Sequence, residues 1–406
     1  MQRNTILLHY TGASAAILLP FAFELLSPVY GLIFLVVGVM YVRRWSTKPR
    51  QALFFTAFLV WQLLSVFWSG YQSAGLADVV MVLPIAVTGI LLSLFKTEDG
   101  ASWMSRWAET FAWATLIAWT YIFIDSVTSY GWVNYKSFDL GGRLGLHFQS
   151  LYLIIAALIL ERKIWRKTFK LSTLRAVAVL WLLFGVIVLS ARIHLMVVPV
   201  LIVLRFTELA WRNKERRRLL ISTAAALVIL MGSLVAVLPG PRGRLIDLRN
   251  ELRSIDGRVN GKQTNHRVFL WKYGLQVVQI SPWIGVGNGA GEEYLHEKLQ
   301  TCKATFYRGK QPYFLHEFKY DFHNIYLQSW AEGGLIAVLL LILLLGWGLW
   351  YSHGAIRYAW ITIVFSGMTE SLLDKQAGAL IITFLVALTA VGSRVRANLS
   401  GTDEGL

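Results

Sequence analysis

The stretch LIAVLLLILLLGWGLW, residues 335–350, has no charged side chain in sixteen consecutive positions. It lies in a longer apolar block, 324–351, in which Glu332 is the only charged residue. A helix rises about 1.5 Å per residue and the hydrocarbon core of a bilayer is roughly 30 Å thick, so about 20 apolar residues cross it. The block therefore predicts a membrane-spanning helix.

Blocks of the same kind recur along the whole chain. Hydrophobic residues make up 56% of the 406 positions, and the mean hydropathy of +0.53 is too high for an ordinary soluble chain. We expect an all-α fold, a polytopic membrane bundle of about twelve transmembrane helices. The other predicted spans are 6–26, 29–42, 51–68, 78–95, 108–126, 146–160, 174–190, 194–210, 219–238, 355–372 and 377–393.

The basic residues predict how the bundle is oriented. Short loops rich in Lys and Arg lie in the cytoplasm. When both termini are placed in the cytoplasm, every short and strongly basic loop falls on that side of the membrane. These loops are 43–50, 162–170, 212–218 and, after the last span, 394–396.

This orientation divides the chain into four parts. Residues 1–238 hold the first nine transmembrane helices, 239–322 form a large outer loop, 323–393 hold the last three helices, and 394–406 are a cytoplasmic tail. A loop as long as 239–322 is usually functional or disordered. Its aromatic residues and the helical periodicity of 267–278 favour an ordered cap with amphipathic helices.

The sequence disfavours several classes of site. Cys302 is the single cysteine, which excludes an intrachain disulfide and a cysteine-cluster metal site. No His, Asp or Glu cluster has metal-ligand spacing, and His316-Glu317 lacks the second His of a zinc helix, so we expect no metal and no cofactor. The net charge of +16 lies mostly in loops, which indicates contact with membrane lipids rather than nucleic acid. The run Gly285–Gly291 lacks a following Gly-Lys-Ser/Thr and is interpreted as a turn that lets backbones pack closely.

Polar residues that could carry chemistry gather at the outer ends of the predicted spans. Each alone has an ordinary explanation, since an interfacial Arg often anchors lipid headgroups and a lone His often caps a helix. Their convergence on one membrane face favours a functional site, because charges at that depth need partners. The residues are Arg143, Arg192, His194, Arg267, His323, Asn324, Glu370 and Asp374.

The residue types in this group suit one class of reaction. Arginine stays charged and binds phosphate oxygens in bidentate fashion. A neutral histidine can take a proton from an attacking hydroxyl. One His with two Arg therefore fits a metal-free transferase that acts on a diphosphate-linked donor.

The chain resembles the O-antigen ligase and polymerase superfamily. The resemblance lies in the span count, the large late loop, Arg267-x-x-x-Trp271, Pro282-x-x-Gly285-x-Gly287 and His323-Asn-x-Tyr-Leu327, and it is closest to the bacterial O-antigen ligases. It implies a GT-C-like helical fold in the bacterial inner membrane, with the active site on the periplasmic side. It also implies transfer of O-antigen from undecaprenyl diphosphate to lipid A–core oligosaccharide, without metal or ATP and with inversion at the anomeric carbon.

The resemblance also implies roles for individual residues. His323 would activate the acceptor hydroxyl, and Arg267 and Arg192 would stabilise the diphosphate leaving group. Arg192 rests on its place after the seventh span rather than on a sharp motif. The residues expected to bind substrate are Arg143, Asn324, Tyr326, Trp271, His194 and Glu370.

Three other functions remain open from the sequence. An O-antigen polymerase would use the same donor with a second lipid-linked glycan as acceptor. A protein-directed oligosaccharyltransferase of the same superfamily is disfavoured because those chains often run longer. A secondary transporter would need inverted repeats and ionisable residues near the bilayer midplane, whereas this chain shows no repeat and its charges cluster at one surface.

Overall fold

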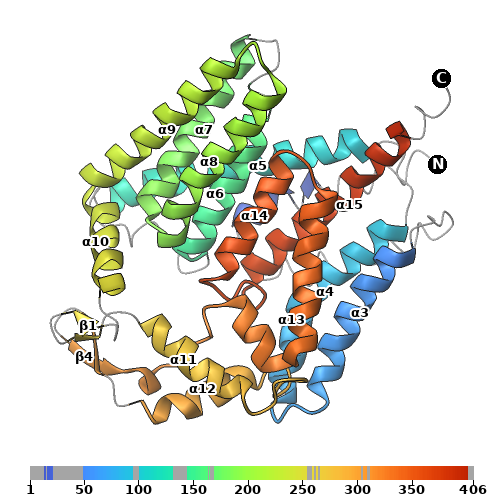
Figure 1. Ribbon diagram of the computed structural model, residues 1–406, viewed down its shortest axis with the longest axis vertical. Coiled ribbons are helices and arrows are strands. Elements are labelled where there is room, and N and C mark those ends of the chain that lie inside the picture. The colour runs from blue at the N-terminus through green and yellow to red at the C-terminus, as the bar shows by residue number, and fades with distance from the viewer. Residues whose placement is uncertain are drawn as a thin grey trace.

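A computed structural model gives the fold (Figure 1). It describes residues 13–14, 16–21, 49–94, 100–130, 144–162, 164, 169–253, 258–259, 262–263, 266–302, 305–308 and 311–400. The predicted span 29–42 and Arg143 lie outside the described residues, as does most of the predicted span 6–26.

The described chain is almost entirely helical, as expected. The helices of the bundle are α3 (Pro49–Val66), α4 (Gln72–Leu94), α5 (Gly100–Tyr130), α6 (Leu146–Glu161), α7 (Phe169–Leu189), α8 (Arg192–Arg212), α9 (Arg217–Val237), α13 (Ile325–Tyr351), α14 (Ala355–Gly367) and α15 (Gln376–Ser400), with the short 3-10 helix η1 (Leu19–Phe21) before them. Between α9 and α13 come α10 (Pro239–Arg253), β1 (Arg258–Val259), β2 (Lys262–Gln263), α11 (His266–Val278), α12 (Gly291–Gln300), β3 (Thr305–Arg308), β4 (Gln311–Phe314) and η3 (Leu315–Glu317).

Among the described residues, six helices are long and apolar enough to cross a membrane: α4, α5, α7, α8, α9 and α13. Shorter apolar stretches occupy Gln51–Val66, Leu146–Glu161 and Gln376–Val391. A membrane helical protein is therefore confirmed, while the total of about twelve spans stays a prediction. The surface of the bundle agrees with a membrane protein. Large apolar side chains such as Ile229 (68% exposed) and Val177 (59% exposed) face outward, where a soluble protein would place polar ones.

One predicted boundary is wrong. The eleventh span was expected over 355–372, but α14 ends at Gly367 and has only 13 residues. Gly367 packs against Ile325, and the chain then turns through 368–375 before α15. Glu370 and Asp374 thus lie on a connecting turn rather than at the end of a span. After this turn, α15 continues to Ser400, and the cytoplasmic tail over 394–406 stays a prediction.

The described parts of 239–322 form a cap at one end of the bundle (Figure 1). The predicted helix over 267–278 is confirmed as α11. Four short strands form a sheet in the order β1-β2-β3-β4, in which only the β2–β3 pair is parallel. The cap has its own apolar core, built around Leu270, Leu295, Leu299, Phe306 and Phe322, so it is an ordered unit rather than a flexible connector.

The glycine run after α11 joins the cap to a break in α13. Gly334 lies inside α13 with φ 68 and ψ −167, which no continuous helix adopts. The backbone groups freed there bond to the turn: Val286 N–H donates to Ala331 O (2.8 Å) and Gly287 N–H to Glu332 O (2.9 Å). This docking satisfies the broken helix internally, as membrane depth requires. The interpretation of the glycine run as a close-packing turn is confirmed.

Gly285→Ala should destabilise the protein by about 2 kcal/mol or more. Gly285 has φ +75, and a Cβ there would overlap the backbone of Glu332, so both the conformation and the space exclude a side chain. The measurement is the thermal unfolding midpoint in detergent. Gly346→Ala is the matched control, because a Cβ at Gly346 meets nothing within 4 Å. Equal midpoints for the two variants would contradict the docking.

Candidate functional site

His323 stands at the junction between the cap and α13. Its backbone has φ 46, in the left-handed region that side chains other than glycine rarely adopt. Asn324 follows as the N-cap of α13, and its side chain accepts hydrogen bonds from the backbone N–H groups of Tyr326 and Leu327. The Asn324 N-cap fixes the start of α13, and His323, the strained residue before it, presents its imidazole to the turn at 368–375. Strain of this kind, about 1–3 kcal/mol, is typical of functional positions.

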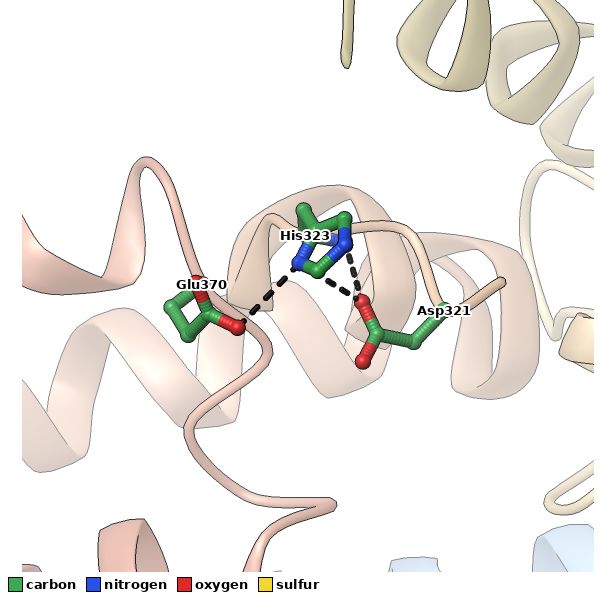
Figure 2. A group of neighbouring side chains, drawn as sticks. All are labelled: Asp321, His323 and Glu370. Carbon is green, nitrogen blue, oxygen red and sulfur yellow. Dashed lines mark hydrogen bonds and ion pairs between the residues drawn. The ribbon is translucent and has the colours of Figure 1, made fainter. Parts of the chain in front are cut away.

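Two carboxylates hold the imidazole of His323 (Figure 2). Its Nδ1 lies 3.1 Å from Glu370 Oε1 and 3.2 Å from Asp321 Oδ1, and its backbone N–H donates to the same Asp321 oxygen at 2.7 Å. An ionised carboxylate only accepts hydrogen bonds, so Nδ1 must carry the hydrogen in this arrangement. The lone pair of the neutral ring is then on Nε2. This tautomer is the one that a general base with an oriented ring requires.

A cation pairs with each of the two carboxylates. Arg267 Nη2 lies 3.3 Å from Glu370 Oε2, and Lys375 Nζ lies 2.9 Å from Asp321 Oδ2. Burial acts to raise the pKa of Asp321, but the nearby charges of His323 and Lys375 outweigh it and the pKa is lowered overall. Asp321 is therefore ionised at neutral pH. Glu370 connects the histidine directly to an arginine.

Arg192 belongs to the same electrostatic environment. It opens α8, two residues after Ser190, the other described non-glycine residue with positive φ. The pKa of His266 is lowered to about 4, first by burial and then by the positive charges of protonated His323, Arg267 and Arg192 nearby. The ring of His266 lies 6.0 Å from that of His323, centroid to centroid. Since Arg192, Arg267 and His323 all lie close enough to act on this one imidazole, the two predicted phosphate-binding arginines share one neighbourhood with the predicted base.

Three predicted substrate-binding residues use their polar groups within the fold. Trp271 Nε1–H donates to Phe322 O at 3.1 Å and the Tyr326 hydroxyl donates to Val364 O at 2.9 Å. Asn324 caps α13 and also donates to Met368 O at 3.2 Å. These bonds build the site, and substrate contact by these residues stays a prediction.

His194 is more deeply buried than the other predicted residues, and Asp374 has different partners from His323. His194 is fully buried, with its Nε2 2.8 Å from Ser366 Oγ. Asp374 accepts a hydrogen bond from Gln328 rather than facing His323. Desolvation and the carboxylates of Asp78 and Glu292 hold the pKa of Asp374 well above its ordinary value. It belongs to an acidic group that also contains Asp78, Glu292 and Glu332.

Sequence reasoning missed three residues of the site. Asp321 lies two positions before His323, and this short carboxylate–histidine spacing was visible but unused. His266 adjoins Arg267 and went unnoticed because a lone His carries little signal. Lys375, next to Asp374, could be linked to Asp321 only through the fold.

Asp321, His323 and Glu370 could also offer ligand atoms to a metal ion, all within 4.8 Å of one another. The sequence expectation that no such group exists is therefore wrong for the folded chain. The fit to a metal is poor, because the other oxygen of each carboxylate already faces Lys375 or Arg267. A divalent ion would add positive charge beside two cations. The geometry favours the group as a support for His323.

The fold and the site define a helical membrane protein with an oriented histidine and two arginines at one end of the bundle. Residues 177–342 match the family model described as O-antigen ligase. This segment contains Arg192, Arg267 and His323, so the similarity to that family includes the three residues predicted to act in catalysis. A search of curated proteins gave no match.

Proposed function

We propose that the protein is an O-antigen ligase of the bacterial inner membrane, which transfers glycan from undecaprenyl diphosphate to lipid A–core oligosaccharide on the periplasmic side. The observation that carries this proposal is the arrangement of His323 Nδ1 between Asp321 and Glu370, with Arg267 on the same Glu370. It supplies a base and a phosphate-binding cation a few ångströms apart, as the family match leads us to expect.

In the proposed reaction, a hydroxyl oxygen of the acceptor attacks the anomeric carbon of the donor glycan. Its proton passes to Nε2 of His323 as the new glycosidic bond forms. The bond between the anomeric carbon and the diphosphate breaks, and its electron pair leaves on the diphosphate oxygen. Attack from the face opposite the leaving group inverts the anomeric configuration. The proton then leaves His323 for water, which resets the base.

The arginines act on the departing diphosphate. A guanidinium has five N–H donors, and the bond from Arg267 Nη2 to Glu370 uses one of them. Arg192 adds a second positive charge from the start of α8. Fixed cations stabilise charge that develops in the transition state without reorganising, which is the usual role of a metal in reactions of this type.

Glu370 is proposed as a positioning residue. Glu370→Gln should lower kcat by about 10²-fold while it changes the donor KM little, because the ring of His323 loses the ionic partner that orients it. Steady-state kinetics on the purified protein measure both constants. Glu317→Gln, on η3 in the cap, is the control for a glutamate outside the site. A raised KM with unchanged kcat would show instead that Glu370 contacts substrate.

A lipopolysaccharide gel tests the proposed function in cells. In a strain that lacks its O-antigen ligase, the protein should restore the ladder of O-antigen on lipid A–core. Absence of the ladder, together with donor chains that fail to lengthen in a knockout of the protein's own host, would establish the polymerase function instead.

A further inference from the structure

Among the described residues, α9 is the least buried of the six helices that are long and apolar enough to cross a membrane. Only 22% of its apolar stretch is buried, whereas the share is 39% or more for the other five. It runs along the outer edge of the bundle, beside α7 and α8 (Figure 1). A helix that packs so little against protein must gain its remaining contacts from lipid.

A half-open cavity of about 270 Å³ lies among α6, α7, α8 and α9. Its wall is mostly hydrocarbon, including Leu183, Leu201 and Leu227. Apolar cavities of about 150 Å³ already admit a benzene-sized molecule, so this one has room for a segment of an acyl chain. An empty space of this size would forfeit packing contacts along its whole wall. The cavity therefore calls for an apolar occupant.

The cavity lies toward the end of the bundle opposite the candidate site. α6 lines it from Ile154 onward, together with Ile164 just after the helix ends. α9 lines it with Thr223 and Leu227, which lie in the first half of that helix. Both segments belong to the end of the bundle away from Arg192, the residue that opens α8. An amphiphile whose chain fills this cavity can thus have its headgroup at the opposite end of the bundle from the candidate site.

The loop between α8 and α9 supplies positive charge at that end. Residues 212–218 contain five basic side chains and one acidic side chain, and all of them are exposed. Arg217 precedes Thr223 of the cavity wall by about 9 Å along the axis of α9. Trp211, which adjoins the loop, is 78% exposed, as is typical of a residue at the headgroup level of a membrane. Basic segments at this level attract anionic lipid headgroups.

The charged side chains beside the cavity neutralise one another. Arg205 Nε lies 3.0 Å from Glu161 Oε2, and its Nη1 lies 3.1 Å from Glu208 Oε2. Arg212 Nη2 lies 2.7 Å from Glu208 Oε1. These two arginines and two glutamates together carry no net charge, so they neither attract nor repel an acyl chain. The excess positive charge lies in 214–218, at the surface, where a headgroup can reach it.

We propose that the cavity holds an acyl chain of an anionic membrane phospholipid, whose headgroup lies at the basic loop 212–218. The lipid fills the space between α9 and the rest of the bundle and holds the hairpin of α8 and α9 in place. Because Arg192 opens α8, the same lipid helps to fix the position of an arginine of the candidate site. The inference does not depend on the proposed reaction.

Added lipid should stabilise the purified protein according to its headgroup. Phosphatidylglycerol should raise the thermal unfolding midpoint in detergent by about 3 °C more than phosphatidylethanolamine with the same acyl chains. Ala176 lines the cavity, and Val177, the next residue of α7, faces outward. Ala176→Phe should abolish this difference, and Val177→Phe should keep it. Equal responses of the two variants, or equal midpoints of the wild type with the two lipids, would overturn the inference.

Substitutions in the basic loop test the headgroup without touching the cavity. A protein with Arg216→Gln, Arg217→Gln and Arg218→Gln should retain about tenfold less phosphatidylglycerol than the wild type in native mass spectrometry. The control carries Arg242→Gln and Arg249→Gln, which replace exposed arginines of α10 in the cap, and should retain as much as the wild type. Equal retention by the two variants would contradict the proposed headgroup position. Displacement of the bound lipid by polyprenyl diphosphate, but not by excess phosphatidylglycerol, would identify a donor lipid as the occupant and reject the phospholipid.

Discussion

We expect His323→Ala to lower the rate of the proposed glycan transfer by about 10³-fold, with little change in the donor KM. The substitution removes Nε2, the proposed acceptor of the hydroxyl proton, while the arginines stay in place. Asp321 and Glu370 lose their common partner, but each keeps a cation, Lys375 or Arg267, so the fold should persist. Transfer is measured with purified protein in detergent or nanodiscs.

His316→Ala is the matched control for this variant. His316 lies in the cap, on η3, where its ring stacks on Phe314 at 5.5 Å between centroids. It should keep nearly full activity. If His323→Ala transfers glycan as fast as His316→Ala, the histidine is not the base, even though residues 177–342 would still match the family model.

Arg267→Ala is the second change with a large expected effect, a fall in kcat/KM of about 10²- to 10³-fold. It removes a fixed cation from the leaving diphosphate and also frees Glu370 from its ion pair. Arg267→Lys should recover only part of this loss, because an ammonium keeps the charge but not the planar, bidentate donors. Rates are compared at several ionic strengths, since a charge contact with diphosphate weakens as salt rises.

Arg249→Ala serves as the control for a cap arginine outside the site. Arg249 is exposed on α10. It should change transfer by less than about twofold, as surface charges rarely contribute more. A loss equal to that of Arg267→Ala would mean that overall basicity of the cap, rather than a placed guanidinium, drives the reaction.

The bundle helices were largely predictable, because helices that lie in lipid consist of long apolar segments that are easy to recognise in a sequence. Each described span corresponds to a mostly apolar block, and Pro84 and Pro199 lie inside α4 and α8, where membrane helices tolerate proline. The break at Gly334 was not predicted. It depends on the turn at Pro282–Gly287, whose backbone replaces the missing helical bonds, and no local pattern records such a long-range partner.

The site was predictable in its residue types and only partly in its connections. Arg267 and His323 stood out from the sequence, and the structure joins them through Glu370. That link spans 47 residues between His323 and Glu370, so it depends on where α14 ends and how the next turn folds back. His194 shows the converse. Its position at a span end predicted an accessible side chain, but packing of α8 against α14 buries it completely.

The most direct test of the central claim is transfer by the purified protein between two defined lipids. The protein is mixed with undecaprenyl-diphosphate-linked O-antigen and lipid A–core in the presence of EDTA, and both lipids are analysed by mass spectrometry. We predict glycan on the lipid A–core, free undecaprenyl diphosphate, and no product from His323→Ala. Glycan that lengthens on undecaprenyl diphosphate while the lipid A–core stays bare, or a reaction that EDTA abolishes and Mg²⁺ restores, would contradict the account.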